Sequence, residues 1–345
     1  MSCETTTVVR KYPSEYSPEG LYFVAKRYVA HSSSEQGLTL LFFHCTGSHK
    51  EVWEPVIQTI FDRIGNIRSP RTAIREAWTF DWQSHGEAGR LNRNFLVHLD
   101  VHVLATELVN GVKRFATTEH PFDDRTFVGI GHSSGVTSML LTTLDDALPA
   151  IPYKALIVME PSALTREVVR RTGMDMYDRM RTLGKAIQKR CDNWSTREEA
   201  KAFFRKRMPW KAWDERALEL FLENGLVELP AQNNDGATVT TATRVYLSCL
   251  PYQEGAAYYG HSDIHHVAAE RLQTLDPNVP VHFMFSAREE VIPKYFRDSL
   301  LALRHVASLQ FIPNSGHLVV QEKPDEVASA IVRVLEGNTG LRANL

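Results

Sequence analysis

Short apolar runs alternate with segments of helical spacing over the first 160 residues of the chain. Gly20–Ala30 and Leu38–His44 predict strands, and the second run is apolar almost throughout, as is typical of a central strand buried on both faces. Further short strands are predicted at Ala77–Asp81, Thr126–Gly131 and Ala155–Met159. All of these runs are too short to span a membrane, which takes about 20 apolar residues.

Helices are predicted between these strands, over Asn94–Phe115 and Val136–Leu144, where apolar residues recur at intervals of three or four. Strands that alternate with helices form a parallel sheet with helices on both faces. The first half of the sequence therefore predicts an α/β fold.

The pattern changes in the middle of the chain. Residues 165–266 are helical, aromatic and basic, and they contain no strong strand signal. Alternation resumes with a strand at Val279–Ser286 and ends with a helix at Asp325–Leu335. We therefore expect one α/β core, formed by residues 1–164 and 267–345, and a helical insertion over 165–266.

The composition, with 43% hydrophobic and 23% charged residues, is that of an ordinary globular protein. A formal net charge of −2 gives no general attraction to nucleic acid or to anionic membranes. The four cysteines are widely spaced, which argues against a zinc knuckle or a disulfide framework and favours a reducing compartment. The first residues lack the apolar core of a secretory signal. We expect no metal and no cofactor.

One pentapeptide contains a candidate catalytic residue. Gly131-His132-Ser133-Ser134-Gly135 follows a predicted buried strand and precedes a predicted helix, which is the strand–turn–helix context of a G-x-S-x-G nucleophile elbow. The flanking glycines are needed because the serine backbone is strained and neighbouring chains pack closely. Ser133 is therefore the candidate nucleophile.

A serine hydroxyl needs a base, and His317 is the candidate because it follows the predicted last strand at Ser308–Pro313. The loop that begins at His44 would supply one amide of an oxyanion hole, and the residue after the nucleophile would supply the other. These donors are the backbone amides of Thr46 and Ser134, with Cys45 as the alternative in the first loop.

Two other groups of polar residues have weaker chemical signals. The turn Asp81–Gly86 follows a predicted strand, and we expect it to organise the sheet edge rather than to react. His261, His265 and His266 lie close together in the insertion but lack a matching carboxylate spacing. A solvated or packing role is favoured for them over a metal site.

The motifs together resemble the α/β-hydrolase superfamily. The elbow, His44-Cys45-Thr46-Gly47, the turn Asp81–Gly86 and Gly316-His317-Leu318-Val319 carry this resemblance, which covers residues 36–164 and 279–336. It implies a mostly parallel eight-stranded sheet with helices on both faces, and it makes the insertion a helical lid.

A narrower resemblance rests on residues 44–55, Glu160-Pro161, 250–260 and 314–326. These segments are similar to fungal peroxisomal hydrolases, a group that includes a yeast peroxisomal lipase, hydrolases of AK-toxin pathways and mycophenolic acid acyl-CoA hydrolase. The resemblance implies an ester or thioester substrate and a peroxisomal or secondary-metabolic setting.

The third member of a Ser/His/acid triad has two candidates. Most members of the superfamily carry an Asp after the seventh strand, and Glu289 stands at that position although the usual glycine is replaced. The fungal group is expected to place the acid after the sixth strand, where this chain has Glu160. Glu160 follows Ala155–Met159 directly, so its carboxylate would emerge at the same sheet edge as Ser133 and His317. We favour Glu160.

The insertion leaves two interpretations open. Residues 165–211 hold fourteen Lys and Arg against six Asp and Glu, which makes either a solvated face or a surface for the phosphates of a coenzyme A thioester. Large apolar residues of the insertion would line an acyl pocket or form its own core: Met174, Met176, Met180, Phe203, Phe204, Trp210 and Trp213.

The sequence thus predicts a serine hydrolase that forms an acyl-enzyme with a small-molecule ester or thioester. The alternatives are a serine-triad lyase or carbon–carbon hydrolase, and a binding protein of the same fold without turnover. The tail Ala343-Asn344-Leu345 fits the small-x-Leu form of a peroxisomal address except at Asn344, where a basic residue is usual. We expect an import receptor as a partner and a peroxisomal location, with the cytoplasm as the alternative.

Overall fold

The computed structural model describes residues 3–66, 73–118, 126–173, 175–232, 238–259 and 263–337. Its main feature is an eight-stranded sheet in the order β1-β2-β4-β3-β5-β6-β10-β11. The strands are β1 (Cys3–Tyr12), β2 (Leu21–Ala30), β3 (Leu38–Phe43), β4 (Ile74–Asp81), β5 (Thr126–His132), β6 (Tyr153–Met159), β10 (Val281–Ser286) and β11 (Ser308–Ile312). β1 and β2 pair antiparallel with their neighbours, and the six strands from β4 to β11 are parallel.

The strands predicted from apolar runs are confirmed, and β1 is an addition. Its sequence, CETTTVVRKY, is largely polar and exposed because the strand lies at the edge of the sheet. Nothing in such a segment distinguishes it from a loop until it pairs along its whole length with β2, from Cys3 opposite Ala30 to Tyr12 opposite Leu21.

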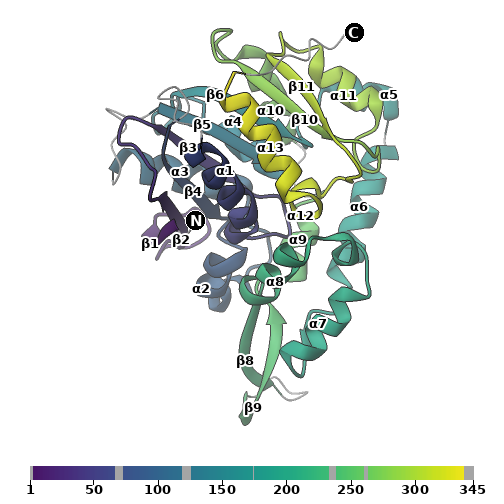
Figure 1. Cartoon of the computed structure of the whole chain (residues 1–345). Helices are drawn as coiled ribbons and strands as arrows, with labels where there is room; N and C mark the ends of the chain where they lie inside the picture. The colour runs from purple at the N-terminus through teal and green to yellow at the C-terminus, as the bar shows by residue number, and fades with distance from the viewer. Residues whose placement is uncertain are drawn as a thin grey trace.

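Helices cover both faces of the sheet, as the alternating pattern predicts (Figure 1). One face packs against α1 (Glu54–Asn66) and α13 (Pro324–Leu335), which lie side by side in front of the sheet in Figure 1. The other face packs against α3 (Ala105–Thr118), α4 (Ser134–Leu141), α10 (Asp263–Thr274) and α11 (Lys294–Leu301). The core also contains α2 (Gly86–Leu96) and the short α12 (Val319–Glu322).

The single helix predicted over Asn94–Phe115 is wrong. The chain forms α2 and α3 instead, and the segment 97–104 between them is not helical. Gln253, far away in the sequence, receives a hydrogen bond from the Val103 amide at 2.8 Å and donates one to the Val101 carbonyl at 3.2 Å. These tertiary contacts satisfy backbone groups that a continuous helix would have used internally.

The insertion is not purely helical, which corrects the sequence expectation. It holds α5 (Arg166–Thr172), α6 (Asp175–Gln188), α7 (Arg197–Arg205), α8 (Glu215–Asn224) and α9 (Pro251–Ala256), and a three-stranded antiparallel sheet in the order β7-β9-β8. Those strands are β7 (Asn193–Trp194), β8 (Leu226–Gln232) and β9 (Thr238–Leu247). β8 contains Pro230, and β9 is rich in threonine, so neither matches the apolar runs by which the core strands are recognised.

The insertion has a small hydrophobic core of its own. Trp194, Phe204 and Phe221 pack together in it, with Phe203, Trp210 and Trp213 at its margin. In Figure 1 this part of the chain, with α7, α8, β8 and β9, lies below the large sheet. Within the described part of the chain, no helix combines the length and the apolar composition that crossing a membrane would require.

Candidate active site

The candidate residues lie where the parallel strands end. Ser133 follows β5, Glu160 follows β6, and His317 lies in the loop after β11. The loop after β3 begins at His44, and β3 is hydrogen-bonded to both β4 and β5. Because the connections leave the sheet in opposite directions on either side of β3, this edge has the crevice in which open α/β sheets bind ligands.

Ser133 occupies a strained turn between β5 and α4. Its φ is 53° and its ψ is −121°, a conformation that a non-glycine residue rarely adopts. The turn is possible because the flanking glycines admit close contacts: a Cβ on Gly131 would lie 2.8 Å from the Val136 Cα, and one on Gly135 would lie 2.2 Å from the Phe43 carbonyl oxygen. The strain exposes the serine hydroxyl above the strand ends and at a helix N-terminus.

Three side chains form a continuous hydrogen-bonded chain across this edge. The Ser133 Oγ is 3.0 Å from the His317 Nε2, and the His317 Nδ1 is 3.0 Å from the Glu160 Oε2. With Nδ1 donating to the carboxylate, Nε2 is left as an acceptor for the serine proton. This is the geometry that allows a histidine to act as a base toward serine.

Glu160 is buried, with 1% of its surface exposed, and its carboxylate is held from two further sides. The Ser286 amide donates to Oε1 at 2.7 Å, and the Arg297 guanidinium lies 3.6 Å from the same oxygen. Its φ of 44° places it, like Ser133, in the left-handed region. Glu289, in contrast, is exposed and accepts a hydrogen bond from the Lys294 amide, so the structure does not bring it to His317.

His132, the residue before Ser133, holds His317 in place by a hydrogen bond to the backbone of His317. Its Nε2 lies 2.8 Å from the His317 carbonyl oxygen, to which it donates. Burial lowers the pKa of His132 to about 3, so the ring is neutral at pH 7 and carries one proton to donate. The contact holds the loop after β11 against the elbow.

Thr46 and Ser134, whose amides the sequence predicts as oxyanion donors, are in contact with each other, and Ser134 directly follows Ser133. Ser134 is the first residue of α4, so its amide has no acceptor within the helix. The Thr46 amide donates to the Ser134 Oγ at 2.8 Å, and the two hydroxyls are also 2.8 Å apart. The backbone amide of Cys45 stays the alternative donor in this loop. Burial raises the pKa of the Cys45 thiol to about 12, which leaves the thiol unreactive.

Two buried histidines join the loop after β3 to the turn after β4. The Trp82 amide donates to the His44 Nε2 at 3.4 Å, and the Gly47 amide donates to the His85 Nε2 at 3.0 Å. Burial lowers the pKa of His44 to about 3 and that of His85 well below its ordinary value, so both rings are neutral acceptors. The turn Asp81–Gly86 therefore organises this edge of the sheet, in line with the sequence expectation.

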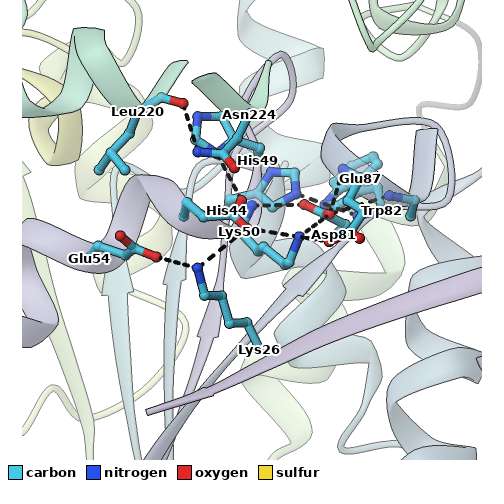
Figure 2. A network of polar contacts seen from close by, with 12 residues as sticks. Lys26, His44, His49, Lys50, Glu54, Asp81, Trp82, Glu87, Leu220 and Asn224 are labelled. Carbon is cyan, nitrogen blue, oxygen red and sulfur yellow. Dashed lines mark hydrogen bonds and ion pairs between the residues drawn. The ribbon is translucent and has the colours of Figure 1, made fainter. Parts of the chain in front are cut away.

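An ion-pair network reinforces the same junction (Figure 2). The Lys50 Nζ lies 3.0 Å from both Asp81 Oδ2 and Glu87 Oε2, and Figure 2 shows it between the two carboxylates. Burial alone would lower the pKa of Lys50, but the charges of Asp81 and Glu51 outweigh it and raise that pKa. A buried lysine that stays charged among carboxylates fixes the loop relative to the turn.

A small open cleft, about 330 Å³ with the solvent at its mouth included, lies on the side of the candidate oxyanion donors. Thr46 and Ser134 line it together with the segment 102–105, Ile264 and His265. The non-helical connection between α2 and α3 thus forms one wall of the cleft, and the start of α10 contributes to another.

The remaining predicted residues have mostly structural surroundings. The His266 Nδ1 donates to the Leu164 carbonyl at 2.7 Å, and its Nε2 lies 3.1 Å from the Tyr177 hydroxyl, which is a packing role. The aromatic residues of the insertion belong to its own core rather than to the cleft, while Met176 packs against the main core. His261, Met174 and the tail Ala343–Leu345 lie outside the described residues.

Sequence reasoning missed His132 and Arg297 as supports of the site. For His132 a signal existed, because it stands next to the candidate nucleophile inside the elbow motif. Arg297 has no such signal, since it lies on a helix and reaches Glu160 only through the fold.

Comparisons with known proteins agree with this architecture. The model of the family described as "Alpha/beta hydrolase family" matches residues 40–330. No curated protein matches the sequence significantly. Among solved structures, the peroxisomal alpha-beta-hydrolase Lpx1 of Saccharomyces cerevisiae is similar with a TM-score of 0.72 and 19% identity, over 98% of this chain and 89% of that chain.

Two further structures are similar at lower identity. A thermophilic esterase from Thermogutta terrifontis has a TM-score of 0.58 and 13% identity, over 97% of this chain and 99% of that chain. A thioesterase domain from the curacin biosynthetic pathway has a TM-score of 0.61 and 13% identity, over 95% of this chain and 99% of that chain. At such identities the likeness concerns the fold.

Proposed function

The chain belongs to the alpha/beta hydrolase family, and we propose that it is a serine hydrolase that cleaves an ester or thioester through an acyl-enzyme. The observation that carries this proposal is the run of two 3.0 Å contacts from the Ser133 Oγ through His317 to Glu160. Strained backbone at both Ser133 and Glu160 supports it, because such strain is retained mainly at functional positions.

In the proposed reaction the Ser133 Oγ attacks the carbonyl carbon of the substrate while its proton moves to the His317 Nε2. The negative oxygen of the tetrahedral intermediate is stabilised by the amides of Ser134 and Thr46, the latter released from its bond to the Ser134 hydroxyl. The imidazolium then protonates the leaving alcohol or thiol. In the second half a water molecule, deprotonated by His317, attacks the acyl-enzyme and frees the acid.

More specifically, we propose that the substrate is a coenzyme A thioester. Arg179, Lys185 and Lys189 are exposed on or just after α6, where they offer an attractive surface to phosphates. Support also comes from the position of the helix end. Arg190, two residues after α6, pairs with Glu254, and a Cβ on Gly47 would lie 2.7 Å from the Glu254 Oε1. The end of α6 is thus next to the candidate oxyanion loop.

The test is covalent labelling with a fluorophosphonate probe, followed by hydrolysis assays on acyl-CoA thioesters and simple esters. Ser133→Ala should lose both labelling and turnover, and His317→Ala should lose nearly as much activity as the double variant because the residues act as a unit. Near-normal turnover in either variant would contradict the mechanism. A native chain that neither reacts with the probe nor turns over any ester would instead indicate a binding protein of this fold.

We also propose a peroxisomal location, supported by the likeness to a yeast peroxisomal hydrolase and by the form of Ala343-Asn344-Leu345. Fusion of residues 334–345 to a fluorescent reporter in a fungal cell should produce punctate signal that is lost when Leu345 is removed. Diffuse signal that does not depend on Leu345 would contradict this address.

A further inference from the structure

The cleft beside the candidate oxyanion donors has a defined place in the proposed reaction. Thr46 and Ser134 line it, whereas Ser133 and His317 are not among its lining residues in the part of the chain that the structure describes. The leaving group must lie next to His317 to receive its proton. The cleft is therefore the site of the acyl group, an assignment that rests on the proposed function.

The size and lining of the cleft limit the acyl groups that fit. Its volume of about 330 Å³ includes open solvent at the mouth, so the enclosed part is much smaller than a typical ligand pocket. Val103, Leu104 and Ile264 supply apolar wall, and His265 supplies a polar group. A short chain fits this space better than a long fatty acyl chain.

His265 is held in one orientation by its neighbours. Its Nδ1 lies 3.0 Å from the Thr137 Oγ1 and 3.2 Å from the Ser162 Oγ, and these two hydroxyls are themselves 3.1 Å apart. The Leu164 amide donates to the His265 carbonyl at 2.9 Å, which fixes the backbone as well. With Nδ1 turned toward the hydroxyls, Nε2 has no partner among the described residues and is the nitrogen available to the cleft.

The charge of this ring follows from its surroundings. Burial lowers the pKa of His265 to about 4, and the neighbouring His266 acts in the same direction. At pH 7 the imidazole is thus a neutral hydrogen-bonding group rather than a cation, so it does not select for carboxylates. A purely apolar acyl group would leave its free nitrogen buried without a partner, which is unfavourable.

We propose that the cleft binds a short acyl group that carries an uncharged hydrogen-bonding substituent, a hydroxyl or keto oxygen, and that His265 recognises this substituent. His265 is then a specificity-determining residue. Sites built to hydrogen-bond a substrate group discriminate strongly against analogues that lack it.

The test compares esters that share one leaving group and differ only in a hydroxyl replaced by methyl. A suitable panel consists of 4-nitrophenyl esters of 2-, 3- and 4-hydroxyacyl groups with their methyl isosteres, such as 3-hydroxybutanoyl against 3-methylbutanoyl. The native chain should prefer at least one hydroxyacyl ester by about tenfold or more in kcat/KM. His265→Leu should reduce that preference to within about threefold by lowering only the hydroxyacyl rate.

His266→Leu is the matched control, because this histidine lies on the same helix and contacts Tyr177 rather than the cleft. It should keep the preference of the native chain. Equal or better rates with every methyl isostere, or an unchanged preference in His265→Leu, would overturn the inference while leaving the hydrolase function intact. The native preference is measured without any variant, so a His265→Leu chain that fails to fold does not remove the test. Absence of turnover with every ester would overturn the proposed function and this inference with it.

Discussion

At the scale of single residues, Glu160 combines three unusual properties. It is almost fully buried, its φ is positive, and it receives both the Ser286 amide and the Arg297 guanidinium on one carboxylate oxygen. The other oxygen is left for His317. A buried carboxylate with both oxygens engaged is held in one orientation, which is what a partner of a catalytic histidine requires.

We predict that Glu160→Gln lowers kcat by about 10³- to 10⁴-fold, because an amide stabilises neither the correct tautomer of His317 nor its cationic form. Glu289→Gln is the matched control and should change kcat less than about twofold, since Glu289 is exposed and does not reach His317. Steady-state kinetics on one substrate, with circular dichroism to check folding, measure both. Similar small losses, or the reverse order, would contradict the assignment of Glu160.

At the scale of elements, α9 of the insertion shapes the core next to it. Gln253 is 2% exposed and binds both Val101 and Val103, and residues 102–105 of the same segment line the cleft. Arg190 and Glu254 form a buried ion pair within the insertion, and that carboxylate lies against Gly47. The insertion therefore contributes to the structure around the cleft.

We predict that Gln253→Leu destabilises the chain by about 1–3 kcal/mol, because it leaves the Val103 amide and the Val101 carbonyl without their partner. Hydrogen exchange at the Val103 amide should become faster, and urea unfolding should show the loss of stability.

The control is Gln188→Leu, which removes a bond from Gln188 to Tyr259 inside the insertion and leaves the segment 97–104 untouched. Equal protection of the Val103 amide in Gln253→Leu and in the native chain would refute the role of Gln253.

At the scale of the whole molecule, several histidines are buried in the neutral state. Burial lowers the pKa of His44 and His132 to about 3 and that of His265 and His282 to about 4. In the unfolded chain each would bind a proton near pH 6.5. Between about pH 4 and 6.5 the unfolded state therefore binds more protons, so the folded state loses stability as the pH falls.

We predict that the free energy of unfolding is at its full value above pH 6.5 and falls by about 2 kcal/mol per buried histidine at pH 5, since one pKa unit corresponds to about 1.4 kcal/mol. Urea unfolding between pH 7.5 and 5 measures this loss. His282→Gln should make the dependence shallower, whereas His98→Gln should not change it because His98 is exposed. Stability that stays constant down to pH 5 would show that these histidines are not buried in neutral form.

The sequence was sufficient wherever the deciding interactions are local. Apolar runs located the central strands. The glycines on either side of Ser133 indicated a tight strand–turn–helix junction. A Cβ at either glycine would clash within that junction or with the adjacent strand. The positions of Ser133 and His317 after their strands followed from the same local pattern. Their roles as nucleophile and base remain predictions.

Only the tertiary structure decided the rest. Glu160 and Glu289 both follow strands, and nothing near either residue tells which one meets a histidine 157 positions away from Glu160. The helix expected over Asn94–Phe115 ends early because Gln253, about 150 residues later, takes its backbone hydrogen bonds. The hairpin of β8 and β9 pairs through its backbone, which apolar patterning does not record. Local sequence determines which conformations a segment favours, and contacts between distant segments determine which of these conformations the folded chain adopts.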